Sequence, residues 1–236
     1  MHYWNQTNFE GLASIGAAYR SETDLALFGQ YCLLREKGLR KQAHEAASLF
    51  SRHLKTLDLA SQRKICVRLV QLQSANPGVH QLLPHPIKTE LMHILEEWIE
   101  ACPQEVLPRV NLGLLSHDIR HFQAALELQP DEQTSVVRLA ECCLSDVDFQ
   151  THHLSESRLI GTVDEANETL CKAAGFIGKV ESLPHRAALN NELEHYRRLM
   201  SEWATYCAEM PDAAFAQWSQ ARGNNFEFPS VVYYDK

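Results

Sequence analysis

Apolar residues recur at the three-to-four-residue spacing of an α-helix along nearly the whole chain, and no segment keeps the two-residue alternation of a strand. Leu, Ala, Glu, Gln and Arg, which favour helices, dominate the composition. Gly (10) and Pro (9) are sparse, and several of them close a periodic segment, as Gly38, Pro77 and Pro211 do. We therefore expect an all-α fold.

The expected helices follow from the periodic segments and their end signals. They span residues 9–20, 21–38, 39–57, 60–75, 87–102, 132–144, 163–178, 184–210 and 212–222. Ser21, with Asp24 in capping-box position, predicts the start of the second helix. One apolar stripe, predicted to face the core, runs along the fifth: Ile87, Leu91, Ile94, Leu95 and Trp98.

Two prolines, Pro84 and Pro86, interrupt the pattern and indicate a boundary between subdomains. We expect an N-terminal helical subdomain at 1–83, which holds the basic helices, and a C-terminal helical-repeat subdomain at 84–236. A non-periodic stretch at about 145–163 predicts a long insertion in the second subdomain. The tail after residue 223 is rich in aromatic residues, so we expect it to be extended and to dock on the body. The two subdomains are expected to form one continuous superhelical domain.

The net charge of −8 is unevenly distributed. Residues 35–68 contain nine Lys and Arg against three acidic residues, while the rest of the chain contains 13 against 27. The basic region could steer a charged partner, or it could be the solvated face of ordinary amphipathic helices. Overall acidity, and the absence of aromatics interleaved with Arg and Lys, argue against a nucleic-acid partner.

The chain has no apolar run of the ~18 residues that span a bilayer, and its N-terminus lacks the pattern of a secretory signal. Its seven cysteines are odd in number, scattered, and form no CxxC pair. We therefore expect a cytoplasmic protein without a membrane partner, whose thiols stay reduced.

Twelve histidines raise the question of a metal site. Three pairs have the spacing of metal ligands on a helix: His117 and His121, Glu90 and His93, Glu192 and His195. His93 is predicted to project away from the core stripe, and His117 away from Phe122, whereas ligands in a helical bundle project inward. We predict neither a metal nor another cofactor, and we interpret residues 116–130 as a packing joint. No nucleotide-binding, nucleophile-elbow or zinc-protease motif occurs.

Small and bulky residues recur in the order of a helical repeat. Phe122, Ala125 and Pro130 match the end of one unit, and Val136, Leu139, Ala140 and Cys143 match the first helix of the next. Ala166, Leu170 and Ala173 fit its second helix, displaced by the expected insertion, and Gly38, Ala43, Ala47 and Phe50 fit an earlier unit. Over about half its length the chain resembles divergent tetratricopeptide-type (TPR-like) repeat proteins.

The resemblance implies an α-α superhelix of stacked antiparallel hairpins and a non-enzymatic interaction module that binds a peptide or protein in a groove. Such a module could be an adaptor, a chaperone or a toxin-neutralising partner. The groove residues that it implies lie on the helix after Pro130: Thr134, Val137, Arg138, Glu141 and Leu144. The alternative is an all-helical enzyme, with or without a metal, that uses His152, His153 and nearby carboxylates in the insertion.

Overall fold

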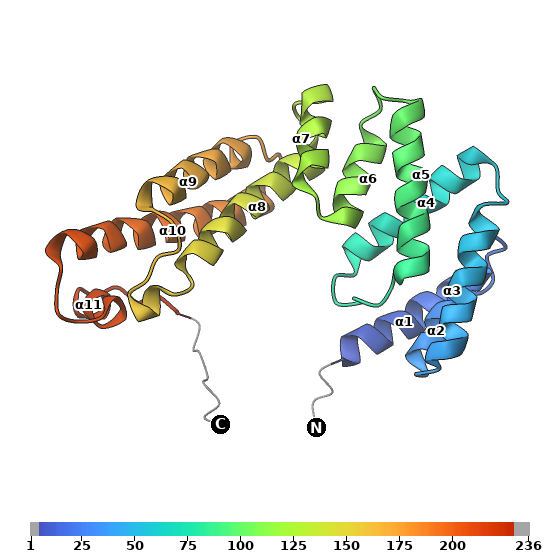
Figure 1. Cartoon of the computed structure of the whole chain (residues 1–236), viewed down its shortest axis with the longest axis horizontal. Helices are drawn as coiled ribbons and strands as arrows, with labels where there is room; N and C mark the ends of the chain where they lie inside the picture. The colour runs from blue at the N-terminus through green and yellow to red at the C-terminus, as the bar shows by residue number, and fades with distance from the viewer. Residues whose placement is uncertain (1–4, 229–236) are drawn as a thin grey trace. The chain divides into compact units, whose positions relative to one another are not determined.

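In the computed structural model, residues 5–228 are described, and every regular element among them is a helix (Figure 1). The all-α prediction is confirmed. The α-helices are α1 (Gln6–Tyr19), α2 (Ala26–Glu36), α3 (Arg40–Leu54), α4 (Leu59–Ala75), α5 (His85–Ala101), α6 (Leu107–Ser116), α7 (Ile119–Leu128), α8 (Gln133–Thr151), α9 (Val163–Ile177), α10 (Leu183–Glu209) and α11 (Phe215–Ala221), with a 3-10 turn, η1 (Leu154–Glu156), after α8. None of the helices in the described range combines the length and apolarity needed to cross a membrane.

The chain divides into two compact units, unit 1 (Met1–Leu128) and unit 2 (Gln129–Lys236). This division differs from the expected boundary at 83/84, which lies inside unit 1. Pro84 is the N-cap of α5, with Pro86 in the first turn, and α5 packs on both α3 and α4. Because proline suits the first turn of a helix, the two prolines start a helix here and do not separate domains.

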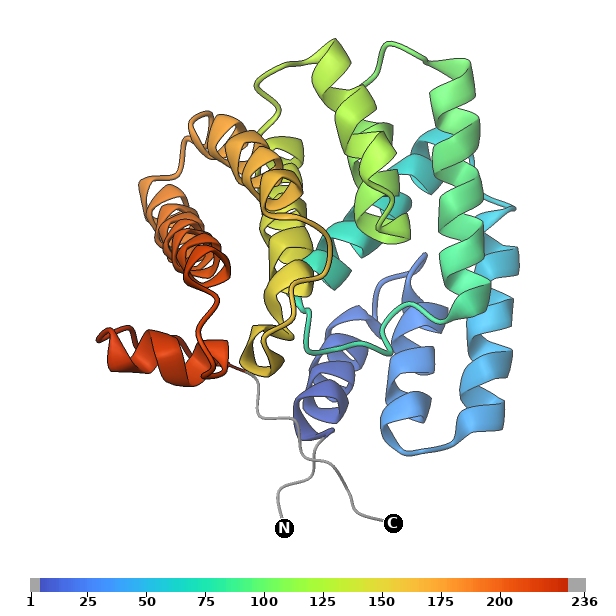
Figure 2. The same cartoon turned by 60° about the vertical axis from the view of Figure 1, so that its left-hand side comes forward.

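In unit 1, successive helices pack on one another. α2 lies between α1 and α3, as Figure 2 shows, and α5 packs on α3, α4 and α6. The apolar stripe predicted on α5 is buried in full, which confirms its register. α7 packs on α6, where the ring of Phe122 lies against Gly113: a Cβ on this glycine would come within 2.8 Å of the ring. Residues 116–130 therefore include the predicted packing joint.

A polar network around Gln81 ties the loop between α4 and α5 to the first two helices. Asn8 is 1% exposed; its Oδ1 accepts the Gln81 backbone N–H at 3.1 Å, and its Nδ2 donates to Gln81 Oε1 at 3.3 Å. Arg35 Nε donates to the same Oε1 at 2.9 Å, and the Tyr31 hydroxyl donates to the Gln81 carbonyl. Because buried polar groups need partners, this network fixes where the loop crosses α1 and α2.

α1 and α2 approach closely at two glycines. A Cβ added to Gly29 would lie 2.8 Å from the backbone nitrogen of Arg20 and 2.9 Å from the carbonyl carbon of Tyr19. A Cβ added to Gly16 would lie 2.7 Å from the Leu33 side chain. The absence of side chains at these two positions therefore allows the helices to touch.

The predicted start of the second helix at Ser21 is wrong. α2 begins at Ala26 after a series of turns, and its N-cap residue, Leu25, makes no side-chain cap. The acidic residues before it form tertiary ion pairs: Glu22 with Arg68, and Asp24 with His53 at 3.7 Å. Burial of Leu25 and these ion pairs override the local capping signal.

In unit 2, α8 packs on α9 and α10, which also pack on each other. α8 runs to Thr151, so much of the insertion expected at 145–163 is helix. Leu144, Val147 and Thr151 continue its buried face, and Leu154 on η1 is buried as well. The Thr151 hydroxyl donates to the Val147 carbonyl at 2.9 Å, which allows a polar residue to be buried there.

Aromatic side chains join the end of α10 to α11. Phe215 packs edge-on against Trp203 and Tyr206, and Trp218 stacks on Phe215. Phe226 and Phe228 lie 6.5 and 6.0 Å from Phe215, centroid to centroid. The described part of the tail therefore docks as expected; Tyr233 and Tyr234 lie outside the described residues.

All seven cysteines are free, as predicted. Cys32 and Cys66 are buried, and burial raises the pKa of each thiol to about 12. Cys171 and Cys207 are exposed.

Candidate functional site

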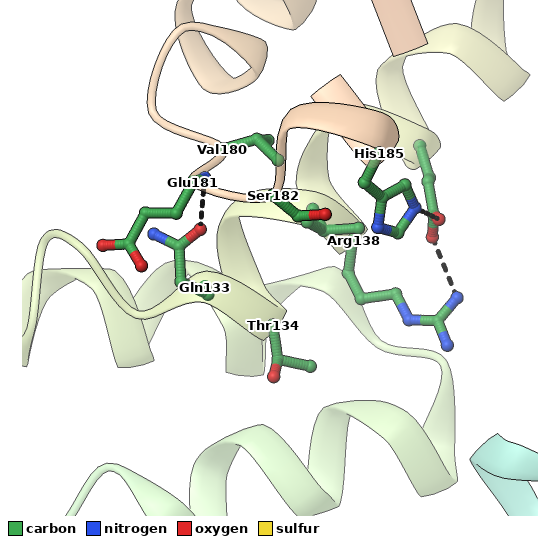
Figure 3. Close-up of a pocket in the computed structure, with 9 residues that line it drawn as sticks. Gln133, Thr134, Arg138, Val180, Glu181, Ser182 and His185 are labelled. Atoms are coloured by element: carbon green, nitrogen blue, oxygen red, sulfur yellow. Dashed lines mark hydrogen bonds and ion pairs between the residues drawn. The ribbon is translucent and has the colours of Figure 1, made fainter. Parts of the chain in front are cut away.

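A pocket of about 430 Å³ lies in unit 2, between the first half of α8 and the segment that leads into α10 (Figure 3). Four of the five predicted groove residues line it: Thr134, Val137, Arg138 and Glu141. Its other residues are Gln133, Val180, Glu181, Ser182 and His185. The structure therefore brings most of the predicted residues together and adds a second wall whose residues the sequence analysis does not name.

The start of α8 gives the lining residues their direction. The Glu132 carboxylate caps the helix by accepting the backbone N–H groups of Thr134 at 3.0 Å and Ser135 at 2.7 Å. Val136, Leu139 and Ala140 are buried, as their positions in the repeat pattern predict, whereas Cys143 is only half-buried. Thr134, Val137, Arg138 and Glu141 occupy the remaining, half-exposed face, at helical spacing.

Leu144 does not belong to this set. It is 1% exposed and part of the core. It lies four residues after Ala140 and eight after Val136, so it shares their buried face of α8. The prediction that Leu144 lines the groove is therefore wrong.

The second wall is attached to α8 through Gln133. The Gln133 Oε1 atom accepts the Glu181 backbone N–H at 2.9 Å, and Nε2 donates to the Lys179 carbonyl at 3.2 Å and the Asp131 carbonyl at 3.0 Å. Val180 between them is buried. Gly178 and Pro184, which bracket a short connection between two expected helices, were the only sequence signal for this wall.

Three polar side chains, Arg138, Glu141 and His185, form successive contacts across the pocket. Arg138 Nη1 donates to Glu141 Oε2 at 2.9 Å, and the other Glu141 oxygen lies 3.7 Å from His185 Nε2. Dashed lines in Figure 3 mark both interactions, one ending at His185 and the other at Arg138. The three side chains are each 35–49% exposed, so the pairs are weak and open to exchange with a ligand. With the half-exposed Val137 as apolar lining, the pocket offers donors, an acceptor and an apolar surface together.

Further along the same two helices, acidic side chains gather. The Tyr196 hydroxyl on α10 donates to Asp148 on α8 at 2.9 Å. Burial raises the pKa of Glu192, and the neighbouring carboxylates Asp148 and Glu141 raise it further. The face shared by α8 and α10 is therefore negatively charged beyond the pocket.

Two of the three pairs noted in the sequence, His117 with His121 and Glu90 with His93, do not converge. His117 adopts a left-handed conformation (φ 62°) at the end of α6, so it is not on one helix with His121. His93 is exposed and pairs with Glu97, and the buried Glu90 pairs with Lys55 at 2.9 Å. Within residues 5–228, no group of three or more His, Cys, Asp or Glu side chains is placed to hold a metal.

His152 and His153, the residues of the alternative reading, lie just after α8. Their ring centroids are 4.0 Å apart, and His152 Nδ1 lies 2.5 Å from the Phe149 carbonyl oxygen. His153 lies 3.5 Å from Glu156, while Asp148 is bound to Tyr196. The two rings are thus engaged with neighbours on their own segment.

Comparisons with protein families, curated proteins and solved structures returned no match for this chain. What the pocket does is therefore inferred from its geometry.

Proposed function

We propose that the chain is a non-enzymatic interaction module that binds a peptide segment of a partner protein along α8, with one side chain of the segment seated in the pocket. The observation that carries the proposal is the pocket itself, since it lies on the face of α8 that the repeat pattern assigns to the groove. Its volume is in the range of ~300–1,000 Å³ typical of ligand pockets.

The proposed architecture is an α-α superhelix of TPR-like hairpins. α8 packs both on α9, its partner in a hairpin, and on α10, which would begin the next one. Ala166, Leu170 and Ala173, the small and bulky positions expected in the second helix, are all buried. In such repeats the first helices of successive hairpins line the groove, which would place α8 and α10 along the ligand.

The lining suggests how a segment would be held. Val137 supplies apolar contact for a side chain, while Arg138, Ser182 and His185 can bond to the polar backbone of an extended peptide. Adaptor, chaperone and toxin-neutralising roles all fit this mode of binding. The proposed compartment is the cytoplasm, where seven unpaired thiols remain reduced.

The test uses a phage-displayed random peptide library selected on the full-length chain. Affinities of the selected peptides are then measured for two matched variants, Ser182→Trp and Ser145→Trp. Both serines are exposed residues of unit 2 whose side chains form no hydrogen bond with any residue in the described range, but only Ser182 lines the pocket. We expect the tryptophan of Ser182→Trp to fill the pocket and exclude the peptide side chain, which should weaken binding about tenfold or more. Ser145→Trp should leave binding unchanged.

A charge reversal gives a second readout. Because Arg138 is 42% exposed, Arg138→Glu should change the free energy of unfolding by no more than about 0.5 kcal/mol. It should weaken peptide binding all the same. Selected peptides that bind all three variants as tightly as the wild type, or a selection that enriches none, would refute the proposal.

A further inference from the structure

The outer face of α3 carries exposed cations that form no ion pair with any described residue. Arg40, Lys41 and Arg52 on α3, and Lys37 just before it, are exposed, and none of their side chains makes an ion pair or hydrogen bond within residues 5–228. Glu45 is the only carboxylate of α3. We call these four cations the α3 basic face.

The local packing leaves this face open. α3 packs on α2 and α5 through small and apolar side chains, among them Ala43, Ala47 and Phe50, which are buried. Figure 2 shows α3, in light blue, at the outer side of the α1–α2–α3 layer. Lys41 and Arg52 lie eleven residues apart on one stripe of the helix, about 16 Å along its axis. Leu49, 46% exposed, borders the stripe.

The positive charge of this face contrasts with the excess of acidic residues in the chain as a whole. The chain has 30 Asp and Glu against 22 Lys and Arg, so carboxylates to neutralise these cations are not scarce. Lys55, at the end of the same helix, shows the contrast, since it is tied to Glu90. Arg20, Lys64 and Lys88 of unit 1 also make no ion pair within residues 5–228. What distinguishes the α3 basic face is that four exposed cations lie within residues 37–52, where Glu45 is the one acidic residue.

We propose that the α3 basic face is a second docking surface, separate from the pocket on α8, and that it binds an acidic segment of a partner protein. The occupant follows from charge complementarity: carboxylates of the segment would pair with Lys41 and Arg52, and an apolar residue would cover Leu49. The surface offers no exposed aromatic residue, and Leu39 and Leu49 are the only exposed leucines in residues 37–52, which disfavours a lipid bilayer. A nucleic acid is disfavoured because a net charge of −8 repels a polyanion more strongly than it repels a short acidic segment.

The test measures binding of a fluorescein-labelled oligoglutamate peptide to the full-length chain by fluorescence anisotropy at several salt concentrations. The matched variants are Lys41→Glu/Arg52→Glu and, as control, Lys172→Glu/Arg198→Glu. All four positions are exposed, and both variants change the net charge equally. We expect binding that weakens with salt, a loss of about tenfold or more in the first variant, and little change in the control.

Two further probes separate the occupants: a single-stranded DNA of the same charge as the peptide, and vesicles containing phosphatidylserine. The proposal requires that the peptide bind more tightly than either, with slowed amide hydrogen exchange at residues 37–52. It is overturned if the DNA or the vesicles bind more tightly, if both variants lose the same affinity, or if the peptide does not bind at all. Sedimentation without peptide tests for self-association. If the chain self-associates and Lys41→Glu/Arg52→Glu abolishes this, the face binds a second copy of the chain, which would also overturn the proposal.

Discussion

Replacing Gly29 with alanine tests whether the close contact between α1 and α2 stabilises unit 1. In an open helix this change raises the free energy of unfolding by up to about 1 kcal/mol, because alanine loses less backbone entropy on folding. At Gly29 the new Cβ would sit 2.8 Å from a backbone atom of Arg20, about 0.6 Å inside the 3.4 Å at which ordinary contact begins. A methyl group has no rotamer that could relieve this overlap.

The cost follows from what must move. The obstructing atoms belong to the backbone at the end of α1, so the helices must separate by about half an ångström along the contact. A gap of this size forfeits a quarter to a half of each affected van der Waals contact, and overpacking a core costs about 1–3 kcal/mol. The upper end of this range, about 3 kcal/mol, applies because the obstructing atoms are backbone and cannot rotate away. Subtracting the gain of about 1 kcal/mol from alanine leaves a net destabilisation of about 2 kcal/mol.

Gly175 on α9 provides the matched control, since a Cβ there meets no atom within 4 Å. The assay is amide hydrogen exchange read by mass spectrometry, which reports each unit separately. We expect the slowest-exchanging amides of unit 1 to exchange about 30-fold faster in Gly29→Ala, the equivalent of 2 kcal/mol. Gly175→Ala should slow exchange in unit 2. Unit 1 exchange in Gly29→Ala that is unchanged or slower would refute the reasoning.

Three other outcomes are expected. Asn8→Ala should lower the free energy of unfolding by about 1–3 kcal/mol in chemical denaturation, because it leaves buried groups of the loop without partners; no measurable change would contradict the network. In the native protein, Cys32 and Cys66 should resist a thiol reagent that labels the exposed cysteines, and seven thiols should react after denaturation without reductant; labelling of these two before the others would contradict their burial. A hydrogen bond from Arg120 lowers the pKa of Asp118 to about 2, so the pair stabilises the folded state fully above about pH 4 and loses this contribution as the pH falls towards 2. NMR titration should show this pKa returning towards about 4 in Arg120→Gln.

The helices most readily predicted were those whose periodicity and end signals agree. On α5, five apolar residues define one stripe and the two prolines mark the start, so packing had only to bury a face that the sequence already specifies. Before α2 the signals conflict. Ser21 and Asp24 fit a capping box, but the burial of Leu25 delays the helix, and such tertiary effects are not visible in a local pattern.

The extension of α8 was missed for a related reason. Asp146, Asp148 and two histidines give residues 145–153 the composition of a loop, yet Val147 and Thr151 continue the buried face. Because a threonine hydroxyl can bond to the carbonyl four residues earlier, its polarity does not exclude burial in a helix. Composition alone does not show this local pairing.

In the pocket, too, the residues on one helix were predictable from the sequence and the contacts between distant segments were not. One wall is a single face of α8, so the repeat spacing was enough to name Thr134, Val137, Arg138 and Glu141. The other wall joins it through Gln133 and Glu181, which are 48 positions apart in the chain. Pairing across such a distance depends on how the helices pack, and periodicity carries no information about it.

The hydrogen bonds by which Gln133 attaches the second wall to α8 bear on how fast the proposed peptide would bind. The Gln133 amide holds the segment before α10 through both its oxygen and its nitrogen, so the second wall is in position before any partner arrives. A site that needs no rearrangement does not delay a partner after encounter, and association rates then vary little among related ligands. If the pocket discriminates between peptides, the difference should therefore lie in how long each one stays bound.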